Sequence, residues 1–65
     1  MNFIVVTDFH SNTKFLVNLD LVGQIHKDGT GSVLLDANGH RLAELKESPK
    51  ELLEAMGWED GDEAP

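Results

Sequence analysis

Short apolar runs separated by polar turns make up the first 45 residues of the chain. Residues 3–7 are β-branched and aromatic, and residues 14–18 form a second run of the same kind. Because such side chains favour strands, the two runs predict a hairpin with a loop of about six residues. Residues 3–6 include no polar position, so we expect the first strand to be buried on both faces.

The middle of the chain predicts a tight corner followed by another extended segment. The corner is residues 18–21, where the Asn and Asp side chains can hydrogen-bond to their own local backbone. Apolar residues resume over 21–25 but are interrupted at Gly23, and a glycine inside a strand pattern is typical of a bulge or a close backbone approach. Residues 27–31 contain two glycines and predict a loop.

The dipeptide Asn38-Gly39 separates two further extended segments, residues 32–37 and 40–45. Asn-Gly is typical of a two-residue type I′ hairpin turn, because both turn positions need a positive φ. This turn fixes a register that predicts two cross-strand pairs. They are Asp36 opposite Arg41 and Leu35 opposite Leu42.

Strand alternation gives this second hairpin two apolar faces. One face carries Val33, Leu35 and Leu42, and the other carries Leu34, Ala43 and Leu45. Since both faces are apolar, we expect both to be covered, one by this domain and the other by a second subunit. Leu34 and Leu45 are therefore predicted to be interaction residues.

A helix is predicted after the second hairpin. Residues 48–51 read Ser-Pro-Lys-Glu, which is a capping box with proline at the first helical position. The helix should run to about Met56 and end at Gly57, a residue type that favours the position after a helix. Trp58 follows directly and is the best candidate for an interaction hot spot, although it could instead cap the small core.

Together these elements predict one small α+β domain over residues 1–58. It should consist of a small twisted antiparallel β-sheet of four or five strands followed by one short C-terminal helix. Residues 59–65 contain four acids, no base and no large apolar residue, so we expect a disordered acidic tail.

The composition of the chain excludes more classes of function than any of its motifs does. The 65 residues carry 12 acids and five bases, a net charge of −7, and four of those seven charges lie in residues 59–65. The acidic balance and the scattered bases argue against direct binding of nucleic acid. The absence of cysteine excludes a disulfide scaffold. With no signal peptide and no apolar run near the roughly 20 residues of a membrane span, we expect a cytoplasmic protein without membrane insertion.

The chain is also short for a stable domain. In a domain of this size, the free energy gained from apolar burial and the entropy lost on folding nearly cancel. No disulfide can contribute, so we expect association with copies of itself, as a homo-oligomer.

Candidate chemistry is sparse. A strand followed by Asp8-x-His10 resembles the opening of calcineurin-type metallophosphoesterases, in which such residues bind a catalytic metal, but the later ligand motifs are absent. A polar turn is the alternative interpretation. His10, His26 and His40 lack the spacing of a helical metal site, although folding could still assemble a zinc site from them. Residues 29–31 lack the lysine of a phosphate loop. We therefore predict no cofactor and no enzymatic activity.

Residues 14–56 resemble the small flagellar-operon proteins called FlbD or SwrD. The matching pieces are Val17-Asn18, Asp20-Leu21-Val22, Ile25, Val33-Leu34-Leu35, Asn38-Gly39 and Glu47-Ser48-Pro49-Lys50-Glu51. The resemblance implies a non-enzymatic bacterial protein linked to flagellar motor output, and it supplies no site residues. The family usually opens with Thr-Arg-Leu-Asn-Gly, whereas this chain has Thr-Asp-Phe-His-Ser at residues 7–11.

We therefore expect a non-enzymatic protein–protein interaction module that acts as a small homo-oligomer and binds a further protein partner. The alternative is an acidic inhibitor or regulator, phage-encoded for example, that occupies the basic surface of a nucleic-acid-binding protein. A third interpretation is an oligomeric metal-dependent hydrolase built around Asp8 and His10.

Overall fold

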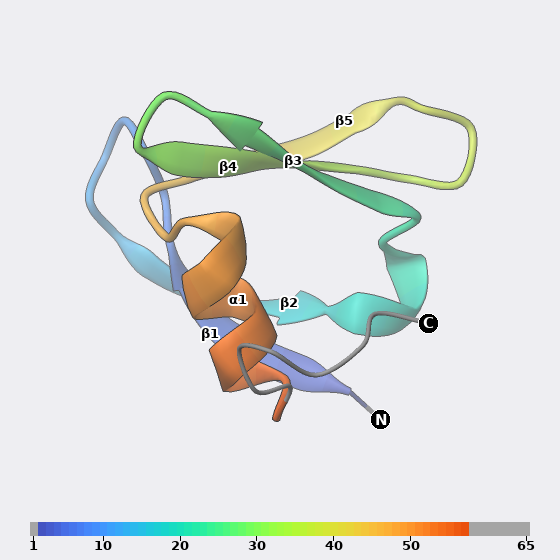
Figure 1. Cartoon of the computed structure of the whole chain (residues 1–65), viewed down its shortest axis with the longest axis horizontal. Coiled ribbons are helices and arrows are strands. Elements are labelled where there is room, and N and C mark those ends of the chain that lie inside the picture. The colour runs from blue at the N-terminus through green and yellow to red at the C-terminus, as the bar shows by residue number, and fades with distance from the viewer. Residues whose placement is uncertain (1, 58–65) are drawn as a thin grey trace.

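Two antiparallel sheets and one helix make up the computed structural model, which describes residues 2–57 (Figure 1). The elements are β1 (Phe3–Thr7), β2 (Lys14–Asn18), the 3-10 turn η1 (Leu19–Leu21), β3 (Gln24–Asp28), β4 (Gly31–Leu35), β5 (Arg41–Leu45) and α1 (Pro49–Ala55). The α+β class, the five strands and the single helix confirm the predicted fold, but the strands divide into a β1–β2 sheet and a β3–β4–β5 sheet. The predicted acidic tail, residues 59–65, lies outside the described residues.

The β1–β2 hairpin buries one face only. Ile4 and Val6 point into the core, whereas Phe3 and Val5, which alternate with them, are exposed. The prediction that β1 is buried on both faces was therefore wrong. No described element covers the outer face of this two-stranded sheet, so alternation along β1 leaves every second apolar side chain in solvent.

The corner between the sheets forms as predicted. The Asn18 side-chain oxygen accepts a hydrogen bond from the Asp20 backbone N–H at 3.0 Å and caps η1. Gly23 follows, and a Cβ at this position would lie 2.8 Å from the Ala37 backbone. The glycine therefore permits the close backbone approach that its place in the strand pattern indicated.

The β4–β5 turn differs from the predicted type. Gly39 has a φ of 85° and Asn38 does not have a positive φ, whereas a type I′ turn needs both. The turn is closed by the Gly39 N–H donating to the Asp36 carbonyl at 3.1 Å and the Asp36 N–H donating to the His40 carbonyl at 2.8 Å. This is the pattern of a three-residue turn with a glycine bulge.

A separate register shift follows between Leu34 and Leu35, which lie opposite Ala43 and Arg41 and leave Leu42 unpaired. With three residues in the turn instead of two, both predicted cross-strand pairs were wrong. Leu35 lies opposite Arg41, and Asp36 bonds with His40.

The two sheets join where β1 and β5 end. Asp8 bridges to Leu45, the Lys46 N–H donates to the Thr7 carbonyl at 2.9 Å, and the Phe9 N–H donates to the Glu44 carbonyl at 3.0 Å. These backbone bonds continue the antiparallel pattern from one sheet to the other. The sheets therefore face each other across a shared interior.

A carboxylate reinforces this joint. The Thr7 N–H and hydroxyl donate to the Glu47 carboxylate at 2.8 and 2.7 Å, and the hydroxyl of buried Ser32 donates to the Glu47 carbonyl at 2.7 Å. Partial burial alone would raise the pKa of the Glu47 carboxyl. The hydrogen bonds to the carboxylate, those from Thr7 above all, and the nearby charge of Lys14 outweigh it, and the pKa lies below its ordinary value of 4.5.

The core between the sheets is small. Its buried apolar residues come from β1, β4, β5 and α1; they are Ile4, Val6, Leu34, Leu45 and Leu52. Helix α1 starts with the predicted capping box, in which Ser48 and Glu51 bond reciprocally, and it is followed by Gly57 with a φ of 92°. At seven residues the helix would be marginal alone, so docking through Leu52 stabilises it.

Candidate interaction surface

The outer face of the β1–β2 hairpin is an exposed apolar surface. Phe3, Val5 and Leu16 lie on it and expose 46%, 58% and 62% of their surface. Val5 lies directly opposite Leu16, and Phe3 is two residues from Val5 on the same side of β1. We call these three residues the hairpin patch.

The backbone hydrogen bonds show how close these side chains lie. The Leu19 N–H donates to the Asn2 carbonyl and the Asp8 N–H to the Thr13 carbonyl, so even-numbered residues of β1 form the hydrogen-bonded pairs. Val5 and Leu16 are therefore a non-hydrogen-bonded pair, the type in which facing side chains approach most closely. The hairpin patch is thus one continuous apolar area.

The remaining outward positions of β1 and β2 are polar without being acidic. They are Thr7, Lys14 and Asn18. Lys14 lies at one end of the face, and Asp20 follows the other end in η1. At the Lys14 end of this face, the Thr7 hydroxyl donates to the Glu47 carboxylate at 2.7 Å, so the face carries a cation and a carboxylate close together.

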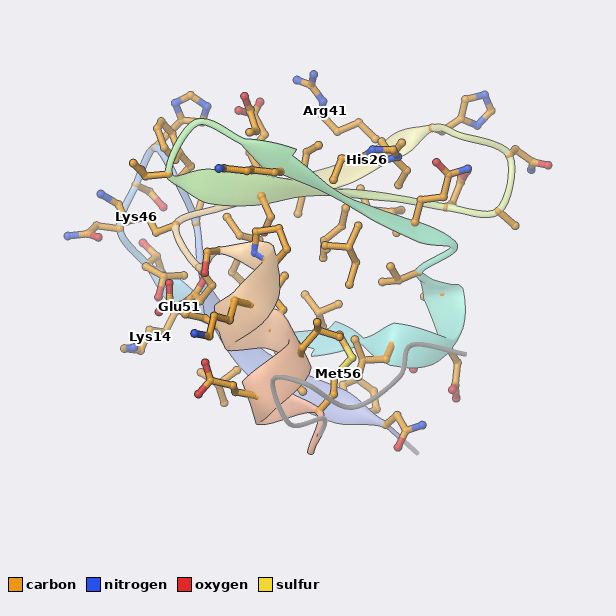
Figure 2. The ribbon with its side chains drawn as sticks, in the orientation of Figure 1. Lys14, His26, Arg41, Lys46, Glu51 and Met56 are labelled. Atoms are coloured by element: carbon orange, nitrogen blue, oxygen red, sulfur yellow. The ribbon has the colours of Figure 1, made fainter. Side chains whose placement is uncertain are left out.

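The outer face of the β3–β4–β5 sheet is organised differently. Val33 on the central strand lies between His26 and Glu44, and Leu35 lies between Gln24 and Arg41. These polar side chains also bond to one another, with the His26 Nε2 2.7 Å from the Gln24 Oε1. Arg41 projects away from the rest of the molecule (Figure 2).

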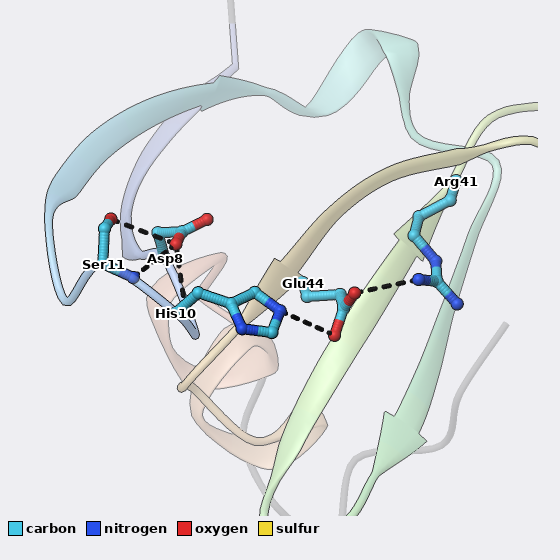
Figure 3. A network of polar contacts seen from close by, with 5 residues as sticks. All are labelled: Asp8, His10, Ser11, Arg41 and Glu44. Atoms are coloured by element: carbon cyan, nitrogen blue, oxygen red, sulfur yellow. Dashed lines mark hydrogen bonds and ion pairs between the residues drawn. The ribbon is translucent and has the colours of Figure 1, made fainter.

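A polar network crosses from the first sheet to this outer face (Figure 3). The Arg41 Nη1 donates to the Glu44 Oε1 at 2.8 Å, and the Glu44 Oε2 lies 3.5 Å from the His10 Nε2. His10 belongs to the β1–β2 loop, so the network links that loop to β5. Leu42, which is 46% exposed, follows Arg41 at the register shift in β5 and has no partner in the β4–β5 register.

The Asp8 carboxylate shapes its own loop. It accepts hydrogen bonds from the backbone N–H groups of Ser11 and His10 and from the Ser11 hydroxyl, at 2.8 to 3.0 Å. These bonds, from Ser11 above all, lower the pKa of Asp8 below its ordinary value of 3.8. Asp8 and His10 thus have structural partners in a polar turn, the second interpretation of the Asp-x-His motif. Among residues 2–57, no three His, Asp or Glu side chains gather as they would around a metal ion.

A hollow of about 270 Å³ lies between the corner and the end of α1. It is lined mainly by apolar groups, from Leu19, Val22, Gly23, Gln24, Ile25 and Met56. Met56 reaches it from the end of α1 (Figure 2). The lining provides no charged group that could orient a small ligand.

The predicted interaction residues do not form a surface. Leu34 and Leu45 are 1% and 0% exposed, because they point from β4 and β5 into the core. A partner cannot reach them in the folded chain, so their assignment as contact residues is corrected. Trp58 lies outside the described residues.

Sequence reasoning missed Phe3, Val5 and Leu16. The missed clue is that a strand pairing with one neighbour in a hairpin often has one uncovered face, so an unbroken apolar run predicts exposed apolar residues there. Leu16, flanked by Phe15 and Val17, carried the same clue in the second strand.

Comparison with known proteins adds no relative. No family model matches the chain, and neither a curated protein nor a solved structure is similar to it. Within residues 2–57, no helix has the length and apolar character needed to cross a bilayer.

Proposed function

We propose that this protein is a non-enzymatic interaction module of the cytoplasm that works by associating with other protein chains, including copies of itself. The hairpin patch is the observation that carries the proposal. Contiguous exposed apolar surface of this kind is disfavoured on a monomeric protein unless a partner uses it. Phe3, Val5 and Leu16 are large, adjacent and on a regular sheet face, which suits them to protein contact.

The small interior supports the same proposal. Five buried apolar side chains form the core of the described chain. A domain of this size usually needs an additional source of stability, and subunit contact is one that requires no cysteine or metal. Association would thus serve stability as well as function.

The expected result is a molecular mass that rises with concentration. Sedimentation velocity from about 1 μM to about 500 μM should show a shift from one chain to a small oligomer, because a patch of limited area gives modest affinity. A single species with the mass of one chain throughout this range would contradict self-association. Affinity capture with the purified protein as bait would then test whether a different protein is the partner.

The charge distribution favours this proposal over an acidic inhibitor of a nucleic-acid-binding protein. Of the eight carboxylates within residues 2–57, five accept hydrogen bonds or pair inside the chain. They are Asp8, Asp36, Glu44, Glu47 and Glu51. Carboxylates used in turns, caps and joints are not arrayed as a surface that mimics phosphates. Deleting residues 59–65 tests this, because loss of partner binding in the shortened chain would favour the acidic inhibitor.

The resemblance to the FlbD or SwrD proteins suggests a flagellar setting for the module. The residues that carry it have structural roles in this chain: Asn18 caps η1, Gly39 forms the β4–β5 turn, and Ser48 with Glu51 caps α1. They support a similar fold more directly than a shared partner. Flagellar genes beside the coding sequence, and weakened swarming after its deletion, are the outcomes that a flagellar role predicts.

A further inference from the structure

We propose that Trp58 packs into the apolar hollow between η1, the start of β3 and the end of α1, and closes it as part of the core. The occupant is a residue of this chain that follows directly on the described residues, which end at Gly57. The proposal goes beyond the proposed function, because it concerns how the chain completes its own interior. It assigns Trp58 to the inside of the domain and leaves the hairpin patch as the surface for partners.

The described chain ends beside the hollow. Met56 lines the hollow and Gly57 follows it (Figure 2). Neighbouring Cα atoms are about 3.8 Å apart, so Trp58 begins two residues from a side chain of the lining. No long loop has to close to bring the indole ring there, and the entropy lost on docking is correspondingly small.

The end of α1 directs the chain toward the same side. Gly57 has a φ of 92°, and its N–H donates to the Glu54 carbonyl at 3.1 Å. These are the left-handed glycine and one of the two hydrogen bonds of a Schellman motif, in which the residue after the glycine commonly contacts an apolar residue five positions earlier. For Trp58 that residue is Leu53, which is 47% exposed. Leu53 and Met56 are three residues apart and therefore neighbours on the helix surface, so a ring against Leu53 adjoins the hollow.

The hollow suits an indole ring in chemistry and in size. The apolar side chains of its lining are half-buried and pack against the core; they are Leu19, Val22, Ile25 and Met56. An apolar cavity of about 150 Å³ is enough to bind benzene, and this hollow has about 270 Å³, which leaves room for the larger bicyclic ring. Covering these side chains removes further apolar surface from water.

A docked Trp58 gives α1 a second point of attachment. Leu52 is the buried residue of this seven-residue helix, and a helix so short depends on docking for its stability. A tryptophan side chain buries roughly 150–250 Å², a large addition to a core with five buried apolar side chains. The proposal therefore explains how a small interior is extended within one chain.

Fluorescence of the full chain tests the proposal. The chain has one tryptophan and no tyrosine, so the emission reports Trp58 alone. A docked indole should emit at shorter wavelength than in the urea-unfolded chain, and acrylamide should quench it several-fold less. Both values should be the same at the lowest and the highest concentration used for sedimentation. Emission and quenching equal to those of the unfolded chain would overturn the proposal.

Two substitutions in the corner separate the hollow from other places that could cover the ring. Val22→Asp puts a charge in the lining, where burial by the indole is costly, so quenching should rise toward that of the unfolded chain. Leu21→Asp is the matched control, because Leu21 is 64% exposed and lies outside the lining. Its quenching should equal that of the native chain.

Circular dichroism should show that both variants are folded. If Val22→Asp is not, Met56→Gln replaces it and puts a polar amide in the part of the lining that α1 provides. Protection of Trp58 that persists unchanged in the folded lining variant would overturn the proposal, because the ring would then be covered elsewhere. Protection that appears only at high concentration would also overturn it, by placing Trp58 against a second chain. Sedimentation velocity of the native chain tests the proposed function separately.

Discussion

The two sheets are alike on their inner faces, which are mainly apolar, and differ on their outer faces, of which one is apolar and the other polar. In both, alternate residues point inward, and the buried apolar ones include Ile4 and Val6 in β1 and Leu34 in β4. On the outside, Val33 in the centre of the three-stranded sheet has His26 and Glu44 as its lateral neighbours, whereas Val5 of the two-stranded sheet has Leu16. Apolar alternation thus fixes the core in both sheets. The cross-strand neighbours decide whether the outer face is suited to water or to a partner.

Shortening a buried leucine should cause the largest loss in the free energy of unfolding, and it tests the difference between inner and outer faces. Leu34→Ala removes a side chain that is 1% exposed, so the free energy of unfolding should fall by about 2–5 kcal/mol. That loss could unfold a domain of this size. Leu16→Ala, at a concentration where the chain is monomeric, should change it by less than about 0.5 kcal/mol. Urea denaturation of both variants measures the difference, and equal losses would contradict the assignment of inner and outer faces.

A glycine in the three-stranded sheet should be the next most sensitive position. A Cβ on Gly31 would overlap the Leu45 carbonyl, so Gly31→Ala must push β4 away from the end of β5. We expect a loss of about 1–3 kcal/mol in the free energy of unfolding, as for other overpacked sites. Thr30→Ala in the exposed turn next to it is the control, and thermal denaturation compares the two. An unchanged stability of Gly31→Ala would show that the backbone at Gly31 and Leu45 can move apart at little cost.

The Glu47 carboxylate, which links the two sheets, should make the stability of the fold depend on pH. The pKa of Glu47 is lower in the folded chain than its ordinary value of 4.5, so its contribution is present above that value and is lost as pH falls through the folded pKa. Glu47→Gln should cost about 1 kcal/mol at neutral pH, because the amide replaces a charged acceptor of two hydrogen bonds.

The pH profile distinguishes this role from simple packing. Urea denaturation at pH values from about 7 down to about 3 should show a smaller loss of stability in Glu47→Gln than in the native chain. Parallel profiles for the two proteins would mean that the Glu47 carboxylate does not couple the sheets to pH.

Breaking the Arg41–Glu44 pair on the surface should have the smallest effect on stability. Arg41 pairs with Glu44 at 2.8 Å, but both side chains are partly in solvent, so Arg41→Ala should change stability by less than about 1 kcal/mol. The small difference should shrink further when salt screens the pair. Thermal denaturation at low and high salt measures it, and a large salt-independent loss would indicate that Arg41 contributes packing instead.

Local signals predicted the elements of this fold well. Ser48 and Glu51 form the capping box, Asn18 caps the corner, and Gly23 allows a close backbone approach, because each depends on neighbouring residues and the geometry of one turn. The type of the β4–β5 turn was not predictable from Asn38-Gly39 alone. The same dipeptide fits a two-residue turn and a three-residue turn with a bulge, and the strand pairing around it decides between them.

The surface was harder to predict than the elements. Which apolar face of a hairpin is covered depends on how the two sheets join, through Asp8 with Leu45 and Thr7 with Lys46, and these contacts link distant parts of the chain. Leu34 and Leu45 were therefore placed on a contact surface when they belong to the core. Composition alone could not distinguish the two faces of a hairpin, because both carry large apolar residues.

The contact between Gly23 and the Ala37 backbone determines where foreign sequence can be attached to this molecule. The β4–β5 turn is exposed, yet its backbone abuts the corner, so an epitope or a fluorescent label grafted there would displace the start of β3. The Gly29-Thr30 turn is exposed too, and nothing lies within 4 Å of a Cβ on Gly29. Labels and affinity handles for imaging or capture are best grafted into that turn.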